Sequence, residues 1–198
     1  MPDTTIRPIE PSAWEDLVDL FGPERGASSG CWCMSHRLTG RPAWDALGAE
    51  GRKAAFKSVV ETGPSPGLLA YDGPTAIGWV AVAPRSDLPR FQTQKVSASV
   101  GSEEATIGAS KTVFVISCFY VRPGYRKRGL MRPLTCAAID HARARGASMV
   151  EACPIETDKP LVWGEGFVGI AGLFRDLGFT EVARRSPRRP LMQLVLEG

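Results

Sequence analysis

The residues best suited to chemistry lie in one basic turn, from Arg122 to Arg128. The segment before it, Thr112–Val121, is β-branched and aromatic almost throughout, which is typical of a strand buried on both faces. The segment after it has apolar residues at helical spacing, and Pro133 fits a first helical turn, where a missing N–H costs nothing. The pattern therefore predicts a strand, a loop and a helix N-terminus in succession.

This turn has the properties of an anion site. A helix that begins directly after a loop presents unpaired main-chain N–H groups, and its dipole adds partial positive charge. Gly129 lets a phosphate approach the backbone closely. The surrounding full charges are Arg126, Lys127, Arg128 and Arg132. We expect a diphosphate to bind here, although the spacing fits neither a Walker A loop nor Gly-x-Gly-x-x-Gly; the alternative is an ordinary basic surface turn.

The remaining elements predict the fold class. Strands are expected at Thr4–Ile9, Gly67–Tyr71, Thr75–Ala83, Met149–Cys153, Phe179–Arg184 and Leu191–Leu196, and helices at 12–21, 42–60, 130–145 and 169–177. This order predicts an α/β fold, with a mixed sheet and helices on both faces. We expect a single domain over 1–198, with a mobile surface insertion at about 95–110.

Composition bounds the function classes. Of 198 residues, 43% are hydrophobic and 23% charged, so a packed core needs no help from metals or disulfides. A net charge of +3 is too small to indicate a membrane or nucleic-acid partner. The five cysteines are odd in number, and no secretory signal pattern or membrane-spanning run is present, so we expect a cytoplasmic location.

The run Phe119–Leu130, FYVRPGYRKRGL, resembles motif A of the GNAT superfamily of N-acetyltransferases. That motif places Arg/Gln-x-x-Gly-x-Gly/Ala at this strand–loop–helix turn. Arg126 and Gly129 match the first two fixed positions, whereas Met131 stands where Gly or Ala is usual. Ala171–Phe179 is similar to the family's late helix, which ends in Gly-Phe. Because the order of elements also agrees, the resemblance covers nearly the whole chain.

The resemblance implies an acyl-CoA N-acyltransferase fold. Its sheet would be mostly antiparallel, with six or seven strands, and splayed between 112–121 and 149–153 to admit acetyl-CoA. The implied cofactor-binding residues are Phe119, Val121, Arg126, Lys127, Arg128, Gly129, Leu130, Met131, Arg132 and Phe174. The implied activity is transfer of an acetyl group from acetyl-CoA to an amine, on a small molecule or a protein, with no metal.

The resemblance also implies how catalysis is distributed. The main-chain N–H of Phe119 would stabilise the developing oxyanion. Phe174 stands where the family often has a tyrosine that protonates the leaving thiolate, so Tyr120 and Cys153 are the candidate substitutes. This departure keeps open a second function, that of an acyl-CoA sensor with little turnover. A third alternative is a domain that binds a different diphosphate nucleotide.

Three carboxylates, Glu151, Glu156 and Glu165, are candidates for the general base, and the alternative for each is a structural or solvated role. By analogy with the family, a homodimer is possible.

The acceptor site is expected near two unusual segments. The resemblance is to a branch with an early Cys-Trp-Cys-Met segment and a Trp-Gly-Glu before the late helix, and it implies acceptor contacts from Trp32, Met34, Trp163 and Glu165. The alternative is that Trp32 and Met34 belong to the core.

Two further groups of residues have weaker interpretations. Cys31, Cys33 and His36 offer zinc ligands but lack a fourth. The arginines at 184, 185, 188 and 189 form a basic cluster for which a solvated hairpin is the simpler interpretation.

Overall fold

The computed structural model describes residues 4–22, 30–98, 112–161 and 164–196. The strands in these ranges are β1 (Thr4–Pro8), β2 (Gly67–Asp72), β3 (Thr75–Pro84), β4 (Thr112–Val121), β5 (Ala147–Ala152), β6 (Thr180–Arg184) and β7 (Pro190–Val195). They form one seven-stranded sheet in the order β1-β2-β3-β4-β5-β7-β6. Each neighbouring pair is antiparallel except β4 with β5. The predicted mixed, mostly antiparallel sheet is therefore confirmed.

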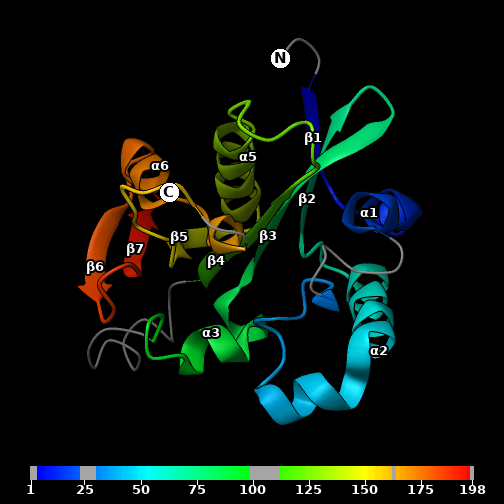
Figure 1. Ribbon diagram of the computed structural model, residues 1–198, viewed down its shortest axis with the longest axis horizontal. Helices are drawn as coiled ribbons and strands as arrows, with labels where there is room; N and C mark the ends of the chain where they lie inside the picture. The colour runs from blue at the N-terminus through cyan, green and yellow to red at the C-terminus, as the bar shows by residue number, and fades with distance from the viewer. Residues whose placement is uncertain (1–3, 23–29, 99–111, 162–163, 197–198) are drawn as a thin grey trace.

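Helices cover both faces of the sheet, as predicted. They are η1 (Pro11–Ala13), α1 (Trp14–Phe21), α2 (Arg41–Thr62), η3 (Arg85–Asp87), α3 (Pro89–Thr93), α5 (Met131–Ala144), η4 (Glu165–Val168) and α6 (Ala171–Asp176). In Figure 1, α5 and α6 lie on one side of the twisted sheet, and α1 and α2 lie on the other. No helix in the described ranges combines the length and apolar character needed to cross a bilayer.

Each face of the sheet carries its own hydrophobic core, and β4 contributes to both. Phe114 and Phe119 pack in the core beneath α5 and α6. Tyr120 packs in the aromatic core beneath α1 and α2, and Val115 packs in a smaller core near α3. The prediction that this strand is buried on both faces is therefore correct.

Gly78 of β3 sets how closely the start of α5 approaches the sheet. A Cβ atom at this position would lie 2.8 Å from Cδ2 of Leu130 and 3.2 Å from Cδ1 of Leu134. The glycine lets these two leucines pack directly on the β3 backbone, since the nearer distance is shorter than real Cβ contacts allow. The packing holds the N-terminus of α5 against the end of β4.

The segment between β3 and the expected insertion is ordered. Arg85–Thr93 forms η3 and α3, and Leu88 and Phe91 are buried. The expected insertion at 95–110 begins with a turn, in which the Ser97 hydroxyl donates to the Phe91 carbonyl at 2.6 Å. Most of the expected insertion lies within residues 99–111, which are outside the described residues.

The sheet opens between its two parallel strands. Pairing of β4 with β5 ends at Ile116 and Ala152, while β4 continues to Val121. Beyond β5 the chain pairs elsewhere: the Ile155 N–H donates to the Gly169 carbonyl at 2.9 Å, and the Ala171 N–H donates to the Ile155 carbonyl at 2.8 Å. The expected splay between these strands is therefore confirmed.

Candidate active site

The loop between β4 and α5 presents a row of unused main-chain donors. On its near side the Tyr125 N–H donates to the Arg122 carbonyl at 3.0 Å, and on its far side the Arg132 N–H donates to the Gly129 carbonyl at 3.1 Å. Within the described ranges, no main-chain N–H from 126 to 131 donates a hydrogen bond. Residues 126–129 are exposed, so these N–H groups face solvent and are open to an acceptor from outside the chain.

The backbone of this loop is bent to expose those donors. Lys127 and Gly129 have φ values of 60° and 78°, in the left-handed region. For Lys127 this conformation costs about 1 kcal/mol or more, and such strain concentrates at ligand-binding loops. Left-handed residues in a short loop produce the concave arrangement of N–H groups that binds anions.

A cavity of about 680 Å³ lies directly beside this loop. Its lining comes from the end of β4, the loop, the start of α5, the η4 segment and α6. The lining residues are Phe119, Val121, Tyr125, Arg126, Lys127, Gly129, Leu130, Met131, Arg132, Leu161, Gly164, Gly166, Phe167, Ile170, Leu173 and Asp176. A cavity of this size suits a cofactor-sized ligand.

Most of the cofactor-binding residues expected from the sequence line this cavity; Arg128 and Phe174 do not. The Arg128 guanidinium lies over the Tyr125 ring, 5.1 Å from its centroid. Phe174 is fully buried, with its ring centroid 6.3 Å from that of Phe119 and 5.0 Å from that of Phe179. Phe174 therefore supports the cavity wall from behind, through Phe119 and the close approach of Gly169 at the end of η4.

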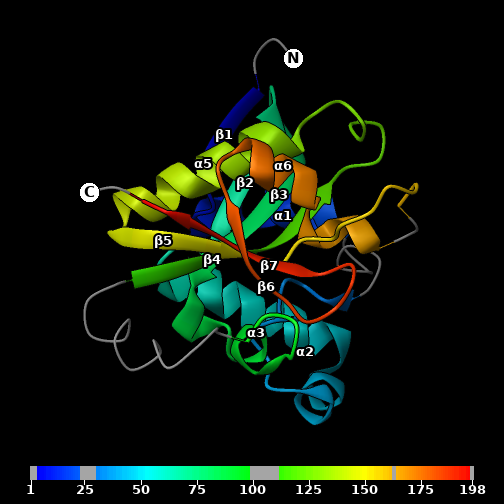
Figure 2. The same cartoon turned by 90° about the vertical axis from the view of Figure 1, so that its left-hand side faces the viewer.

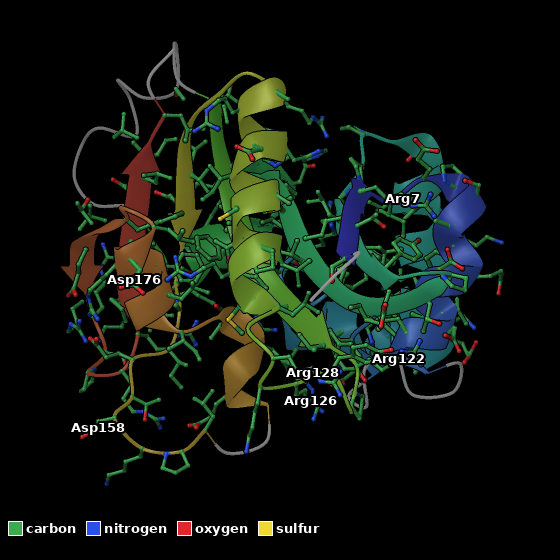
Figure 3. The ribbon with its side chains drawn as sticks, turned by 90° about the horizontal axis from the view of Figure 1, so that it is seen from above. Arg7, Arg122, Arg126, Arg128, Asp158 and Asp176 are labelled. Carbon is green, nitrogen blue, oxygen red and sulfur yellow. The ribbon has the colours of Figure 1, made fainter. Side chains whose placement is uncertain are left out.

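The cavity is positively charged on its loop side. Arg126 and Arg128 lie near the first turn of α5 (Figure 3). The Arg126 Nε donates to the Val121 carbonyl at 3.0 Å, which fixes this side chain at the cavity edge. Arg132 is partly neutralised by Asp176, whose carboxylate lies 2.8 Å from its guanidinium. The net charge therefore favours an anionic ligand.

The free edge of β4 faces the gap. The Arg122 N–H donates to the Ile77 carbonyl at 2.9 Å, so the main-chain groups of residue 122 point toward β3. Main-chain groups alternate in direction along a strand, so those of Phe119 and Val121 point away from β3, toward the opening. An extended ligand could pair with this edge as a short additional strand.

The two candidate proton donors differ in their surroundings. Tyr120 packs between Phe21 and Phe167, with ring centroids 5.5 and 6.2 Å away, and its hydroxyl makes no hydrogen bond within the described residues. The Cys153 thiol is 3% exposed and donates to the Val96 carbonyl at 3.5 Å. Burial raises the pKa of this thiol. Neither residue lines the cavity, and of the two side chains the Tyr120 hydroxyl is the one without a hydrogen bond to the described residues.

The candidate bases are all engaged in ion pairs. Glu151 is 3% exposed, pairs with Arg85 and accepts a 2.8 Å hydrogen bond from Gln193. Glu156 lies at the surface, where hydrogen bonds from Arg175 and Arg184 lower its pKa. The carboxylate of Glu165 lies 2.8 Å from the Arg188 guanidinium. None of the three lines the cavity, and these contacts agree with the structural alternative.

The early Cys-Trp-Cys-Met segment is packed in the core beneath α1 and α2. Trp32 is fully buried and stacks on Trp14 with ring centroids 6.3 Å apart, and Met34 is also buried. Both placements match the core alternative. Burial raises the pKa of the Cys33 thiol well above its usual value. In the described part of the chain no three His, Cys, Asp or Glu side chains come together as metal ligands.

Trp163, an expected acceptor contact, lies outside the described residues. Several residues that line the cavity were not expected from the sequence. The unexpected ones are Tyr125, Leu161, Gly164, Gly166, Phe167, Ile170, Leu173 and Asp176. Only the unusual Trp-Gly-Glu segment pointed toward this region. The apolar residues of η4 and α6 resemble any core residues in sequence, and only their packing against β4 brings them to the cavity.

Comparisons with known proteins agree with this geometry. The model of the family described as "Acetyltransferase (GNAT) family" matches residues 31–162. An N-acetyltransferase from Staphylococcus aureus is similar in structure, with a TM-score of 0.53 at 11% identity over 98% of this chain and 99% of that one. A putative acetyltransferase from Salmonella typhimurium, solved with acetyl-CoA, has a TM-score of 0.53 at 16% identity over 99% and 95% of the two chains.

A putative acetyltransferase from Pyrococcus horikoshii has a TM-score of 0.50 at 16% identity, over 91% of this chain, which spans only 44% of that longer protein. No curated protein sequence matches this chain significantly.

Proposed function

This chain belongs to the GNAT acetyltransferase family, and from that premise we propose that it transfers an acetyl group from acetyl-CoA to an amine. The observation that carries the proposal is the row of unused N–H donors from Arg126 to Met131 beside a cavity of about 680 Å³. A structural relative from Salmonella typhimurium was solved with acetyl-CoA, which supports the choice of co-substrate.

The residues present fit acetyl-CoA. The N–H groups of the loop and the side chains of Arg126, Lys127 and Arg132 would hold the diphosphate. The main-chain groups of Phe119 and Val121 face the opening and would pair with the amides of the pantetheine arm. The Val121 carbonyl can accept from such an amide beside the Arg126 Nε, since a carbonyl oxygen has two lone pairs. When bound, acetyl-CoA supplies a thioester whose carbonyl carbon a neutral amine can attack.

Catalysis would then depend mainly on positioning. The main-chain N–H of Phe119 faces the gap and would donate to the thioester oxygen as negative charge develops there. We assign proton donation to the departing thiolate to the Tyr120 hydroxyl, since it has no other hydrogen bond in the described residues. The reaction of acetyl-CoA with the amine would be accelerated chiefly because binding holds the two reactants in contact.

An alternative function, an acyl-CoA sensor with little turnover, is favoured by one observation. Phe174 occupies the position of a tyrosine that family members often use as an acid, and it is fully buried. The two functions differ only in turnover, so a single assay separates them.

The test has two stages. Thermal unfolding is measured with CoA, ATP and NAD; CoA at a hundredfold its Kd is expected to add about 2.7 kcal/mol of stability. Thiol release from acetyl-CoA is then followed over a panel of amines. Stabilisation by CoA with amine-dependent thiol release supports the enzyme. CoA binding with no release by any amine supports the sensor, and absence of CoA binding contradicts both.

A further inference from the structure

A cluster of basic residues lies on the opposite face of the sheet from the cavity. Its members come from distant segments: His36 precedes α2, Arg90 is in α3 and Arg189 is in the β6–β7 turn. The Arg90 N–H donates to the His36 carbonyl at 3.1 Å, and the His36 ring lies 5.8 Å from the Phe91 ring. Burial, with the charges of Arg90 and Arg189, lowers the pKa of His36 to about 4. The imidazole is therefore neutral at neutral pH.

This cluster adjoins the point where the sheet opens. The Arg189 guanidinium donates two hydrogen bonds to the Cys153 carbonyl, at 2.7 and 3.2 Å, and Cys153 directly follows β5. The neighbouring Arg188 pairs with Glu165 of η4, and the residues on either side of Glu165 line the cavity. In both ribbon views the β6–β7 turn lies at the same end of the sheet as α3 (Figures 1 and 2). Arg189 therefore contacts the residue that follows β5, and its neighbour Arg188 contacts η4 beside the cavity.

Within the described residues, no carboxylate forms an ion pair with Arg90 or Arg189. Arg85 is paired with Glu151, and Arg37 lies 3.8 Å from Asp87. Arg90 has neither an acidic partner nor a hydrogen-bond acceptor for its guanidinium within the described residues, although it is half-buried. A partly desolvated cation without a counterion is unfavourable, and a bound anion relieves that cost.

We propose that Arg90 and Arg189 bind a carboxylate or phosphate group of the acceptor, so that the acceptor is a small molecule carrying both an amine and an anion. The inference rests on the proposed acetyl transfer and specifies its substrate class. Guanidinium groups form paired, charge-assisted hydrogen bonds with either anion. Arg90 and Arg189 are two half-buried cations held together by three segments, an arrangement that suits one compact anion. An extended polyanion needs an open row of cations.

The test compares three probes with the same aminoethyl group: β-alanine, phosphoethanolamine and ethanolamine. Each is titrated calorimetrically into the CoA-saturated protein at constant ionic strength. We expect at least one anionic probe to bind about tenfold more tightly than ethanolamine, and its charge type identifies the anion. Arg90→Gln should lose about tenfold for that probe. The matched control is Arg143→Gln, an exposed change on α5, which should leave the affinity unchanged.

The outcomes separate this inference from the proposed function. If CoA fails to bind, the acetyltransferase proposal fails and this inference falls with it. If CoA binds but ethanolamine binds as tightly as both anionic probes, or no probe binds, only the inference is overturned. Unchanged anion affinity in a folded Arg90→Gln, verified by its melting temperature, also overturns it.

Discussion

Phe167 of η4 packs against Tyr120 of β4, with ring centroids 6.2 Å apart, beyond the point where β4 has lost its pairing with β5. Phe167 also lines the cavity, so this contact joins the cofactor side of the sheet to the opposite face. The η4 segment therefore shapes the gap through which a thioester would reach an acceptor.

Replacement of Tyr120 by Phe tests its role as proton donor. The substitution keeps the ring contacts with Phe21 and Phe167 and removes only the hydroxyl. We expect CoA affinity and melting temperature to stay unchanged while kcat falls about tenfold to a hundredfold. Stopped assays of thiol release across pH measure this. An unaltered kcat at every pH would remove Tyr120 from the mechanism.

Gly129→Ala should weaken CoA binding by about tenfold or more. The added Cβ meets no protein atom within 4 Å, so it would project into open space beside a cavity-lining residue and obstruct the diphosphate. Gly124→Ala is the matched control: Gly124 lies in the same loop, also has a positive φ and open surroundings, but does not line the cavity. CoA affinity is measured by calorimetry. An equal loss of affinity in the two variants would attribute that loss to backbone strain alone.

Glu151→Gln should act on stability rather than on chemistry. The change leaves Arg85, which is 13% exposed, buried without its counterion, and such a loss costs about 3 kcal/mol. Urea unfolding measures the loss, with the exposed Glu61→Gln on α2 as a control expected to change stability by less than about 0.5 kcal/mol. Retained stability with loss of the acidic limb in the kcat profile would instead make Glu151 the base.

His36 should make the fold sensitive to acid. Its folded pKa is about 4, below the ordinary value of 6.5, so between these values the unfolded chain binds a proton that the folded chain does not. Its contribution is present above pH 6.5 and is lost as the pH falls toward 4, by about 2 kcal/mol near pH 4.5. Urea unfolding of the wild type and His36→Gln at pH 7 and pH 4.5 tests this. The variant should lose less stability on acidification; an equal loss would contradict the assignment.

Local patterns were sufficient to predict the part of the site that is contiguous in sequence. The apolar run Thr112–Val121, the basic loop and the helix after it make their own strand, turn and N-terminus, and the structure places them as expected. Their chemistry depends on main-chain geometry, which glycine and helix-start signals encode within a few residues.

Residues brought together by tertiary packing could not be predicted in this way. The sequence left Trp32 open between an acceptor contact and a core position, and the structure buries it completely against Trp14 and Phe21 of α1. Phe167 and Arg90 gave no signal, because their positions depend on how η4 meets β4 and how α3 meets the loop before α2. Helical or strand periodicity reports which face is buried, but not which distant segment covers it.

The measurement that tests the central claim most directly is residue-resolved amide hydrogen exchange of the loop, with and without CoA. The N–H groups from Arg126 to Met131 have no acceptor within the described chain, so they should exchange quickly in the free protein and become protected when CoA binds. Amides of the exposed helix around Glu50 provide an internal control and should not change. If CoA binds while the exchange of 126–131 stays the same, the diphosphate lies elsewhere and the site is wrongly placed.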